Sequence, residues 1–397
     1  MDVTVMELRC ALPALQGIDA RLSVRYRDLF VAHLSTADKL AAGFRAAPAV
    51  TVGFAATQAA WRFFNNDAVT LPVLAEPIWD CARREIPAAC DDWLLVVMDW
   101  CNLRYNAHAS KAERVELTRR NDVGYELMTA LAVSDRDGAP IAPVCLELRA
   151  GNGVHSTRAA APLESGSSLD GLRPVMDHVR GQLADKPAGG AATAPAPKPA
   201  VFIIDREADS VGHFRDWNLG GHHYLVRADD QPRVLHDLKA MALGEVADAM
   251  KAADVFAFSR DVDFKGGPAR QFVAEAPIVL ERPATTQRID KTSGKPVKKR
   301  IAGPPLPLRL IVSEVRDERG NVLARWLLLT NLPASGPAAV DAATVALWYY
   351  WRWRIESYHK LLLLLEHHDL EELRDMTRKL LPGVPRKSTP EREGKDV

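Results

Sequence analysis

The sequence predicts an α/β fold, and three observations support this. Trp93 to Met98 is a continuous apolar run rich in branched residues, which is typical of a strand buried in the middle of a sheet. A second short run of this kind, Ala200 to Ile204, follows later, and the two runs end in Asp99 and Asp205. Near the C-terminus, Val340 to Leu381 contains neither Gly nor Pro, so a long helix is permitted there.

The segments between and after these runs complete an alternating pattern. Two further strands, Tyr125 to Val133 and Ile141 to Leu148, flank a turn at residues 134–138 and predict an antiparallel hairpin. An amphipathic helix is expected over Ser168 to Leu183 and another strand over Tyr224 to Arg227. The order is therefore strand, hairpin, helix, strand, helix, strand and a late helix for which Asp341 is the expected N-cap.

Composition changes along the chain predict its domain boundaries. The region after the core strands changes to short strands and turns, and an Ala/Pro/Gly-rich segment over Asp185 to Ala200 reads as a mobile linker. We expect a helical domain over residues 1–90, the first part of the core over 91–232, a β-rich insertion over 233–332, a core-completing helix over 333–381 and a disordered tail over 382–397.

Bulk composition indicates an ordinary globular protein. The 397 residues are 47% hydrophobic and 26% charged, and their formal net charge is zero. Any field that attracts nucleic acid must therefore come from local clusters of basic residues. We see no signal peptide and no apolar run long enough to span a membrane, which favours a cytoplasmic location. The cysteines are odd in number and lack CxxC spacing, so free thiols are expected at Cys10, Cys81, Cys90, Cys101 and Cys145.

The richest pattern lies on the predicted late helix. Tyr349, Arg352, Glu356 and Lys360 recur at three- and four-residue steps, which places them on one helix face. Cations there could hold phosphate oxygens, the ring could pack on a sugar or base, and the carboxylate could hold a metal ion. In the alternative interpretation, apolar residues of this helix form the core and the charges form a solvated face of ion pairs.

Tyr349 to Lys360 resembles the Tyr-x2-Arg-x3-Glu-x6-Lys signature of the IS-four type of DDE insertion-sequence transposases, which cut and paste DNA. Asp205-Arg206-Glu207-Ala208-Asp209 and Arg325 to Thr330 resemble two further family segments, and Thr57 to Asn66 is similar to an N-terminal one. The signature's final lysine falls on Leu363 here, and the family usually continues further past this point.

This resemblance implies an RNase H-like catalytic core with a β-rich insertion and an N-terminal helical DNA-binding domain. It makes Asp99, Asp205 and Glu356 the catalytic carboxylates, which hold two Mg²⁺ or Mn²⁺ ions. It also implies nicking at the element's end, hairpin formation, hairpin opening and joining to target DNA, with Asp209 beginning or capping the next helix. The implied partners are double-stranded DNA at the transposon end and target, and a second copy of the chain in a nucleoid-associated synaptic homodimer.

Several further residues are candidates for contact with DNA. The resemblance assigns Arg62 and Asn65 to the transposon end, Trp326 to stacking on an extruded base, and Arg227, Tyr349, Arg352 and Lys360 to DNA near the cut. Charge density adds a basic loop that contains Lys298, Lys299 and Arg300. The alternatives are an amphipathic helix with a polar end around Arg62, a core role for Trp326, and a solvated basic loop.

Three rival functions remain at this stage. The first is a truncated, inactive transposase that only binds DNA ends or inhibits the intact enzyme, which Leu363 and the short C-terminal region favour. The second is an RNase H-like nuclease unrelated to transposition. The third is a protein without any site, in which the three carboxylates have only structural roles.

Overall fold

The computed structural model describes residues 15–36, 58–119, 121–184, 197–289 and 296–364. Its contacts divide the chain into two compact units. One comprises residues 1–14, 18–66 and 356–397, and its described parts are α2 (Ala20–Thr36), residues 58–66 and most of α9 (Trp353–Leu364). The other comprises residues 15–17 and 67–355 and holds the sheet. The disordered tail expected over 382–397 and most of the expected linker lie outside the described residues.

The second unit is a mixed α/β structure built on one large sheet. Its strand order is β5-β4-β3-β1-β6-β7-β15-β14-β11-β8-β9, with β10 paired to β11 and β2 to β3. The pairs β1–β6 and β6–β7 are parallel, whereas β1–β3, β3–β4 and β7–β15 are antiparallel. The strands are β1 (Leu94–Arg104), β2 (Val115–Glu116), β3 (Val123–Ser134), β4 (Pro140–Ala150), β5 (Gly153–Ser156), β6 (Ala200–Ile204), β7 (His223–Ala228), β8 (Arg233–His236), β9 (Lys239–Ala242), β10 (Ala257–Phe264), β11 (Gly267–Leu280), β14 (Leu306–Arg316) and β15 (Val322–Thr330).

The predicted strands and hairpin of the core are confirmed. β1 and β6 have the apolar sequences expected of central strands, and their buried parts run side by side from Leu94 to Met98 and from Ala200 to Ile204. The β3–β4 hairpin turns at residues 134–138, where Gly138 adopts a φ of 70°. Asp135 in this turn accepts hydrogen bonds from the backbone N–H groups of residues 91–93, which fixes the entry into β1.

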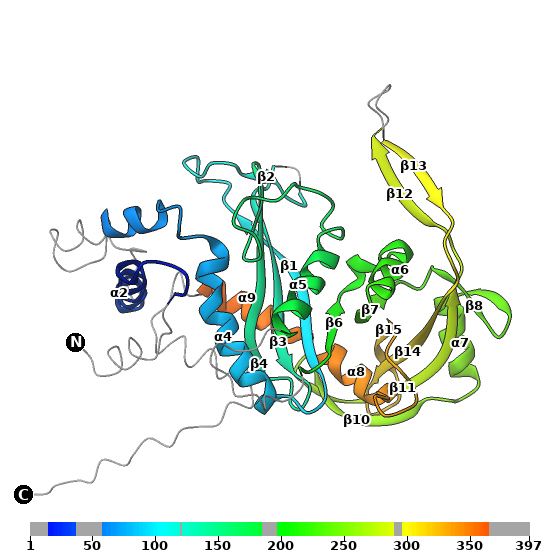
Figure 1. Ribbon diagram of the computed structural model, residues 1–397. Helices are drawn as coiled ribbons and strands as arrows, with labels where there is room; N and C mark the ends of the chain where they lie inside the picture. The colour runs from blue at the N-terminus through cyan, green and yellow to red at the C-terminus, as the bar shows by residue number, and fades with distance from the viewer. Residues whose placement is uncertain (1–14, 37–57, 120, 185–196, 290–295, 365–397) are drawn as a thin grey trace, which may run out of the picture. The chain divides into compact units, whose positions relative to one another are not determined.

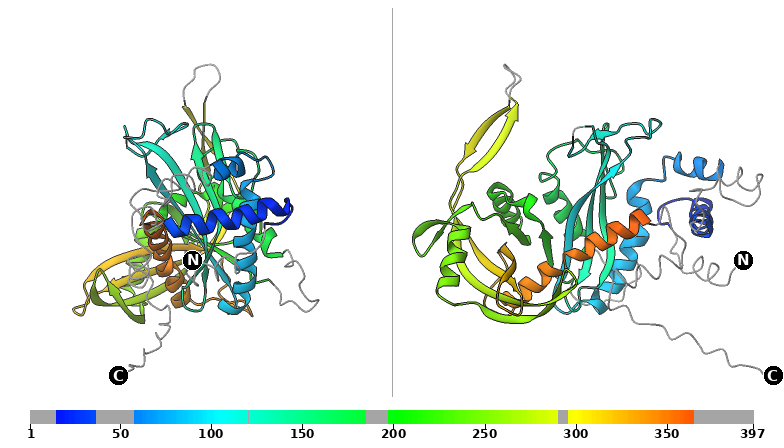
Figure 2. Two further views of the ribbon diagram at one scale, coloured as in Figure 1. Left: turned by 90° about the vertical axis from the view of Figure 1, so that its left-hand side faces the viewer. Right: turned by 180° about the vertical axis from the view of Figure 1, so that it is seen from behind.

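The two faces of the central strands carry different partners because side chains alternate along a strand. Even-numbered residues of β1 and β6, such as Met98 and Phe202, belong to a core shared with the helices α4 (Leu71–Ala89), α5 (Leu172–Ala184), α6 (Val211–Leu219) and α7 (Leu243–Ala252). Odd-numbered residues, which include Asp99 and Asp205, face the other way. The helix α8 (Ala342–Trp351) lies on that second face (Figures 1 and 2).

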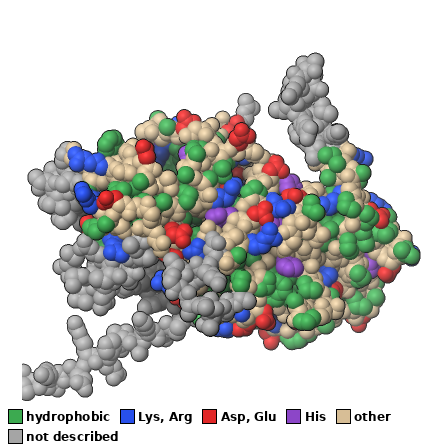
Figure 3. Space-filling view, viewed as in Figure 1, with side chains coloured by type: hydrophobic (Ala, Val, Ile, Leu, Met, Phe, Trp, Pro, Cys, Tyr) green, Lys and Arg blue, Asp and Glu red, His purple; other side chains and the backbone are tan. Residues whose placement is uncertain are grey.

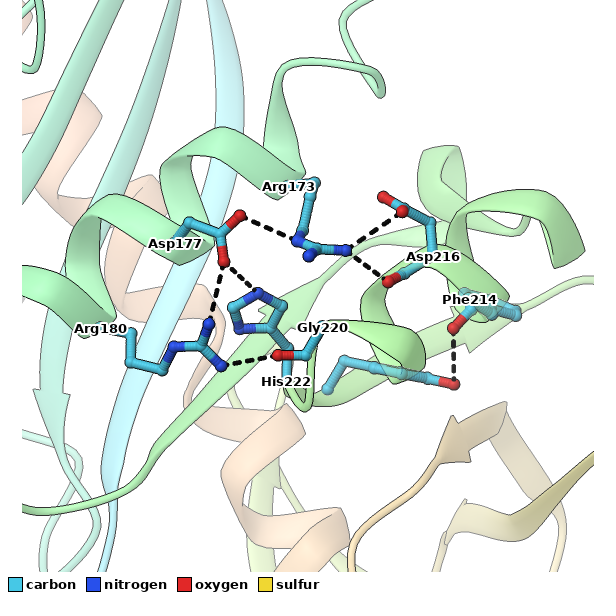
Figure 4. Close-up of polar contacts among 8 residues, drawn as sticks. Arg173, Asp177, Arg180, Phe214, Asp216, Gly220 and His222 are labelled. Atoms are coloured by element: carbon cyan, nitrogen blue, oxygen red, sulfur yellow. Dashed lines mark hydrogen bonds and ion pairs between the residues drawn. The ribbon is translucent and has the colours of Figure 1, made fainter.

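A polar cluster joins α5 to α6 and to the segment that leads from α6 into β7 (Figure 4). Arg173 donates to the Asp177 carboxylate at 2.9 Å and to the Asp216 carbonyl at 2.6 Å. Arg180 donates to the Gly220 carbonyl at 2.6 Å, and the ring of the buried His222 is 2.9 Å from the same Asp177. These contacts fix the helix layer on the face opposite α8.

The strands of residues 233–332 extend the same sheet, because β15 pairs with β7. One pair departs from it: β12 (Ala284–Ile289) and β13 (Pro296–Ile301) form a separate two-stranded hairpin that projects from the sheet (Figures 1 and 2). The helix α7 in this region was not predicted from the sequence. The side chain of Glu245 caps it by accepting from the Ala242 N–H at 2.7 Å.

The expectation of a single helix through residues 349–360 is wrong. Asp341 caps α8 as predicted, accepting from the Thr344 N–H at 2.8 Å, but α8 ends at Trp351 and α9 begins at Trp353. At the junction the backbone N–H of Arg352 donates to the Tyr349 carbonyl, and the backbone N–H of Ile355 donates to the Arg352 carbonyl, both at 3.1 Å. These bonds span three residues instead of four, so they tighten the chain around Arg352 and interrupt the α-helix.

Four consecutive aromatic residues hold α8 in place, each on a different neighbour. The Trp348 ring centroid lies 6.3 Å from that of Trp93, and the Tyr349 centroid lies 6.2 Å from that of Trp326. Tyr350 donates its hydroxyl to the Asp263 carbonyl at 2.9 Å, and Trp351 packs against the turn at Gly138. A helix that is apolar on all sides is normally buried, and α8 fits that rule.

Within the described residues, no helix is both long and apolar enough to cross a membrane. Cys81, Cys90, Cys101 and Cys145 are free thiols, as predicted, whereas Cys10 lies outside the described residues. Acidic and basic side chains intermingle on the face drawn in Figure 3, in keeping with a formal net charge of zero.

The contact between the hairpin turn and Trp351 leads to a stability prediction. A Cβ on Gly138 would lie 2.5 Å from the Trp351 ring, in addition to the strain of a φ of 70°. Gly320 is a matched control, because it has a φ of 83° but nothing within 4 Å of the added Cβ. We expect Gly138→Ala to lower the free energy of unfolding by about 2–4 kcal/mol and Gly320→Ala by about 1 kcal/mol. Equal losses in urea denaturation would show that Trp351 does not press on the turn.

Candidate active site

Asp99 and Asp205 lie next to each other on the central strands. Asp99 directly follows the last β1 residue that pairs with β6, and Asp205 directly follows β6 itself. Because β1 and β6 are parallel and Val97 pairs with Ile203, Asp99 and Asp205 follow at equivalent positions two residues later, with their side chains on the same face. Each carboxylate also accepts from the next backbone N–H, that of Trp100 at 2.9 Å and that of Arg206 at 2.7 Å.

The guanidinium of Arg352 bridges the two aspartates. Its Nη1 lies 3.2 Å from Asp99 Oδ2, and its Nη2 lies 3.3 Å from Asp205 Oδ2. The Arg352 side chain is 6% exposed, against 21% for Asp99 and 30% for Asp205. A nearly buried cation therefore joins two carboxylates that remain accessible from solvent.

Asp205 has two further partners. The Tyr349 hydroxyl donates to Asp205 Oδ1 at 2.9 Å, and Arg227 Nη1 on β7 lies 3.7 Å from the same oxygen. Burial alone would raise the pKa of Asp205, but Arg352, the Arg206 N–H, Tyr349 and Arg227 together hold it below its usual value. Burial and the adjacent Asp205 charge raise the pKa of Tyr349, so its hydroxyl remains a hydrogen-bond donor.

Glu207 belongs to the same electrostatic cluster, although no sequence pattern predicts a role for it. It lies in the short 3₁₀ helix η2 (Arg206–Ala208), whose N-cap is Asp205. Burial, followed by the charges of Asp99 and Asp205, raises the pKa of Glu207. The signal in the sequence that could have indicated a role for Glu207 is its position two residues after Asp205, inside the segment that resembles the transposase family.

The structure corrects the role of Asp209. The residue before α6 is Ser210, not Asp209, which closes η2 instead. The nearly buried Asp209 carboxylate accepts from Arg282 at 2.8 Å and from the Asp229 N–H at 3.3 Å. Asp209 therefore ties the segment after Asp205 to residues farther along the chain.

The candidate residues Trp326 and Arg227 occupy the same face of the sheet. Trp326 is 8% exposed, and its ring packs between those of Phe264 and Tyr349 at centroid distances of 6.4 and 6.2 Å. Its neighbour Tyr349 contacts Asp205, so the Tyr349 ring alone separates Trp326 from the carboxylate pair.

The basic candidates of the projecting hairpin lie on β13. Lys298, Lys299 and Arg300 pair with Gln287, Thr286 and Thr285, respectively. Arg300 is exposed, whereas the side chains of the two lysines lie outside the described ones.

The remaining candidates lie in the other compact unit. Glu356 is in the first turn of α9, four residues after Arg352, and Lys360 is exposed one turn later. The Leu363 side chain is outside the described ones. Arg62 and Asn65 are exposed around the end of a helix over residues 58–64, and Asn65 donates to the Trp61 carbonyl at 2.8 Å.

The donor chemistry of the pair suits a hard divalent cation. Two aspartates supply only oxygen ligands, which Mg²⁺ and Mn²⁺ prefer. Arg352 already fills the position between them with a positive charge, so the pair is arranged around a cation. Among the described side chains, no group of three or more His, Cys, Asp or Glu residues has an arrangement that would hold a metal ion.

A scan against models of known protein families found no match to this chain, and a search of curated proteins also found none.

The bridge predicts a pH-dependent loss of stability when Arg352 is removed. In Arg352→Met the burial of Asp205 is no longer offset by its main cation, so its pKa rises. Two adjacent carboxylates then destabilise the fold when both are ionised, and the loss shrinks as acid protonates them. We expect Arg352→Met to lower the free energy of unfolding by about 2–4 kcal/mol at neutral pH and by less near about pH 4.5.

The measurement is urea denaturation across that pH range. Arg354→Met, two residues further on, is the matched control and should cost little at any pH. A deficit in Arg352→Met that stays constant as the pH falls would contradict the electrostatic origin of the effect.

Proposed function

We propose that this protein is a metal-dependent DNA phosphodiester hydrolase and transferase with an RNase H-like core, of the DDE transposase type. The strand order β4-β3-β1-β6-β7 supports this core, because an antiparallel hairpin follows β1 while β6 and β7 run parallel to it. The projecting hairpin fits the proposed insertion, whereas α4 belongs to the compact unit that holds the sheet and not to a separate helical domain ending at residue 90.

One observation carries the proposal: Asp99 and Asp205, which are more than a hundred residues apart, meet on the guanidinium of Arg352. Other arginines of the chain also contact two carboxylates, as Arg173 contacts Asp177 and Asp216, so the bridge supports the proposal through its place in the sheet. Here two carboxylates lie where the parallel pairing of β1 with β6 ends, and they remain partly exposed beside a tyrosine and a second arginine. This arrangement suits metal-assisted phosphoryl transfer, because it offers acceptors for a metal and donors for a phosphate.

In this mechanism Asp99 and Asp205, with Glu356 as the proposed third ligand, would hold two Mg²⁺ or Mn²⁺ ions. When bound, these ions would supply charge neutralisation at the reacting phosphate and activation of the attacking oxygen. The water oxygen forms a bond to phosphorus, the P–O3′ bond breaks, and the leaving 3′ oxygen gains a proton while water loses one. In later steps of the proposed reaction the freed 3′-hydroxyl replaces water as the attacking group.

The chain's own residues prepare this site. Tyr349 and Arg227 keep Asp205 ionised and oriented, and the buried face of α8 excludes water from the sheet below the pair. Arg352 neutralises the carboxylates in the absence of substrate and would turn to a phosphate oxygen when a divalent cation takes its place. A guanidinium suits both partners, because its fork matches carboxylates and phosphates equally well.

A second candidate function is DNA-end binding without cleavage. The observation that favours it is that Arg352 already balances part of the carboxylate charge, so the pair could serve only to fasten α8 to the sheet. Removal of divalent metal distinguishes the two functions.

We expect DNA binding without metal and nicking only with it. Contacts between basic residues and phosphates need no ion, whereas activation of water does. The assay compares gel shift and nicking of a duplex carrying the DNA that flanks the gene, with Mg²⁺ and with EDTA. Loss of a metal ligand removes several kcal/mol of transition-state stabilisation, so Asp205→Asn should nick roughly 100-fold more slowly or worse.

Asp229→Asn is the matched control, since Asp229 is an exposed carboxylate paired with Arg206 outside the bridge. It should retain nicking close to that of the unmodified chain. Equal nicking by the Asp205 and Asp229 variants would refute the catalytic role of Asp205. Binding without any nicking by the unmodified chain would favour the second function.

A further inference from the structure

The projecting hairpin is anchored at its base by one arginine of α6. Arg215 donates from Nε to the Pro304 carbonyl at 2.8 Å and from Nη2 to the Arg282 carbonyl at 3.0 Å. Arg282 precedes β12 and Pro304 follows β13, so a single guanidinium spans the two connecting segments through which the chain enters and leaves the hairpin. Two hydrogen bonds from one planar group restrain both segments relative to α6.

Close packing reinforces this anchor. A Cβ added to Gly303 would lie 2.8–2.9 Å from atoms of the Arg215 side chain, so the guanidinium lies directly on the Gly303 backbone. A Cβ on Gly212, in the first turn of α6, would lie 3.1 Å from the Ala284 Cβ at the start of β12. The base of the hairpin therefore rests on α6 at two points.

A second link joins the hairpin to the carboxylate site. Arg282 forms an ion pair with Asp209 at 2.8 Å, and the Asp209 side chain is only 8% exposed. Asp209 closes η2, the 3₁₀ turn that Asp205 opens. The path from the Asp205 carboxylate to the base of the hairpin is thus one short turn and one nearly buried ion pair.

All charged residues of the two hairpin strands are basic. The segments Ala284–Ile289 and Pro296–Ile301 contain no acidic residue, and their charged residues are the four cations Arg288, Lys298, Lys299 and Arg300. A narrow two-stranded arm with this charge suits a polyanionic duplex. Each strand has six residues, which spans roughly 20 Å, or about six base pairs along a duplex axis.

We propose that Arg215 and the Asp209–Arg282 pair are positioning residues that hold the hairpin as a rigid arm, so that its grip on the DNA backbone determines which phosphodiester reaches Asp99 and Asp205. The proposal rests on the proposed function and adds to it how the cut site is selected. A tilt of roughly 10° at the base would move the far end of the strands by about 3.5 Å, close to one base-pair step. Loosening the base therefore makes the position of cleavage imprecise before it abolishes binding.

The experiment maps nick positions on an end-labelled duplex of the DNA that flanks the gene, and follows amide hydrogen exchange over residues 281–285 and 301–303. Arg215→Met should make exchange in these segments roughly tenfold faster and spread a single nick over neighbouring positions. Its affinity for DNA without metal should change by less than about threefold, because the hairpin cations remain. Arg233→Met is the matched control, as Arg233 also donates to a backbone carbonyl, that of Ala240, but away from the hairpin base.

Two other variants guard against misfolding of Arg215→Met. Gly303→Ala displaces the guanidinium while Arg215 is retained, and Arg282→Met breaks the link to Asp209 alone. Both should spread the nick positions in the same way. A single, unshifted nick in all three variants despite faster exchange would overturn the arm proposal and leave the proposed function intact. Absence of nicking by the unmodified chain would overturn both.

Discussion

The interaction on which this structure depends is the bridge from Arg352 to Asp99 and Asp205. It joins the middle of the sheet to the end of α8 and balances two negative charges that would otherwise repel each other at close range. A nearly buried guanidinium requires such partners, because an unpaired charge in the same place would cost several kcal/mol. The carboxylates in turn need a cation, and Arg352 supplies it.

The surroundings of the bridge show why it can be built here. The parallel pairing of β1 with β6 ends just before Asp99 and Asp205, so the two aspartates lie on neighbouring strands within reach of one side chain. The aromatic residues of α8 fix the helix on the sheet, and the tightened turn after Trp351 directs Arg352 back toward the pair. Packing of α8 on the sheet thus determines where Arg352 lies, whereas the charges of Arg352, Asp99 and Asp205 determine what the site can bind.

The proposed site combines stability with function. A cation that is covalently part of the chain holds the carboxylates together, and the same guanidinium is suited to a phosphate once it is released. In the proposed mechanism, a divalent cation that binds the same oxygens would offset the cost of releasing the guanidinium. The Asp209–Arg282 pair extends this polar framework to the projecting hairpin.

The sequence by itself determined the central elements. Apolar runs before Asp99 and Asp205, the turn at residues 134–138 and the cap at Asp341 are local signals, and each depends only on neighbouring residues. The spacing of Tyr349 and Arg352 is a local signal too, and both side chains contact Asp205. Their assignment to DNA and the role of Glu356 remain predictions.

Only the tertiary structure decided where these residues point. No Gly or Pro marks the break between α8 and α9 in the sequence. The break accompanies the packing of four aromatic side chains and the ion pairs of Arg352 with two carboxylates that are distant in the chain. The pairing of β15 with β7 and the clamp of Arg215 on the hairpin base likewise join residues far apart in the chain. Such contacts depend on how the layers pack, and no local pattern encodes that.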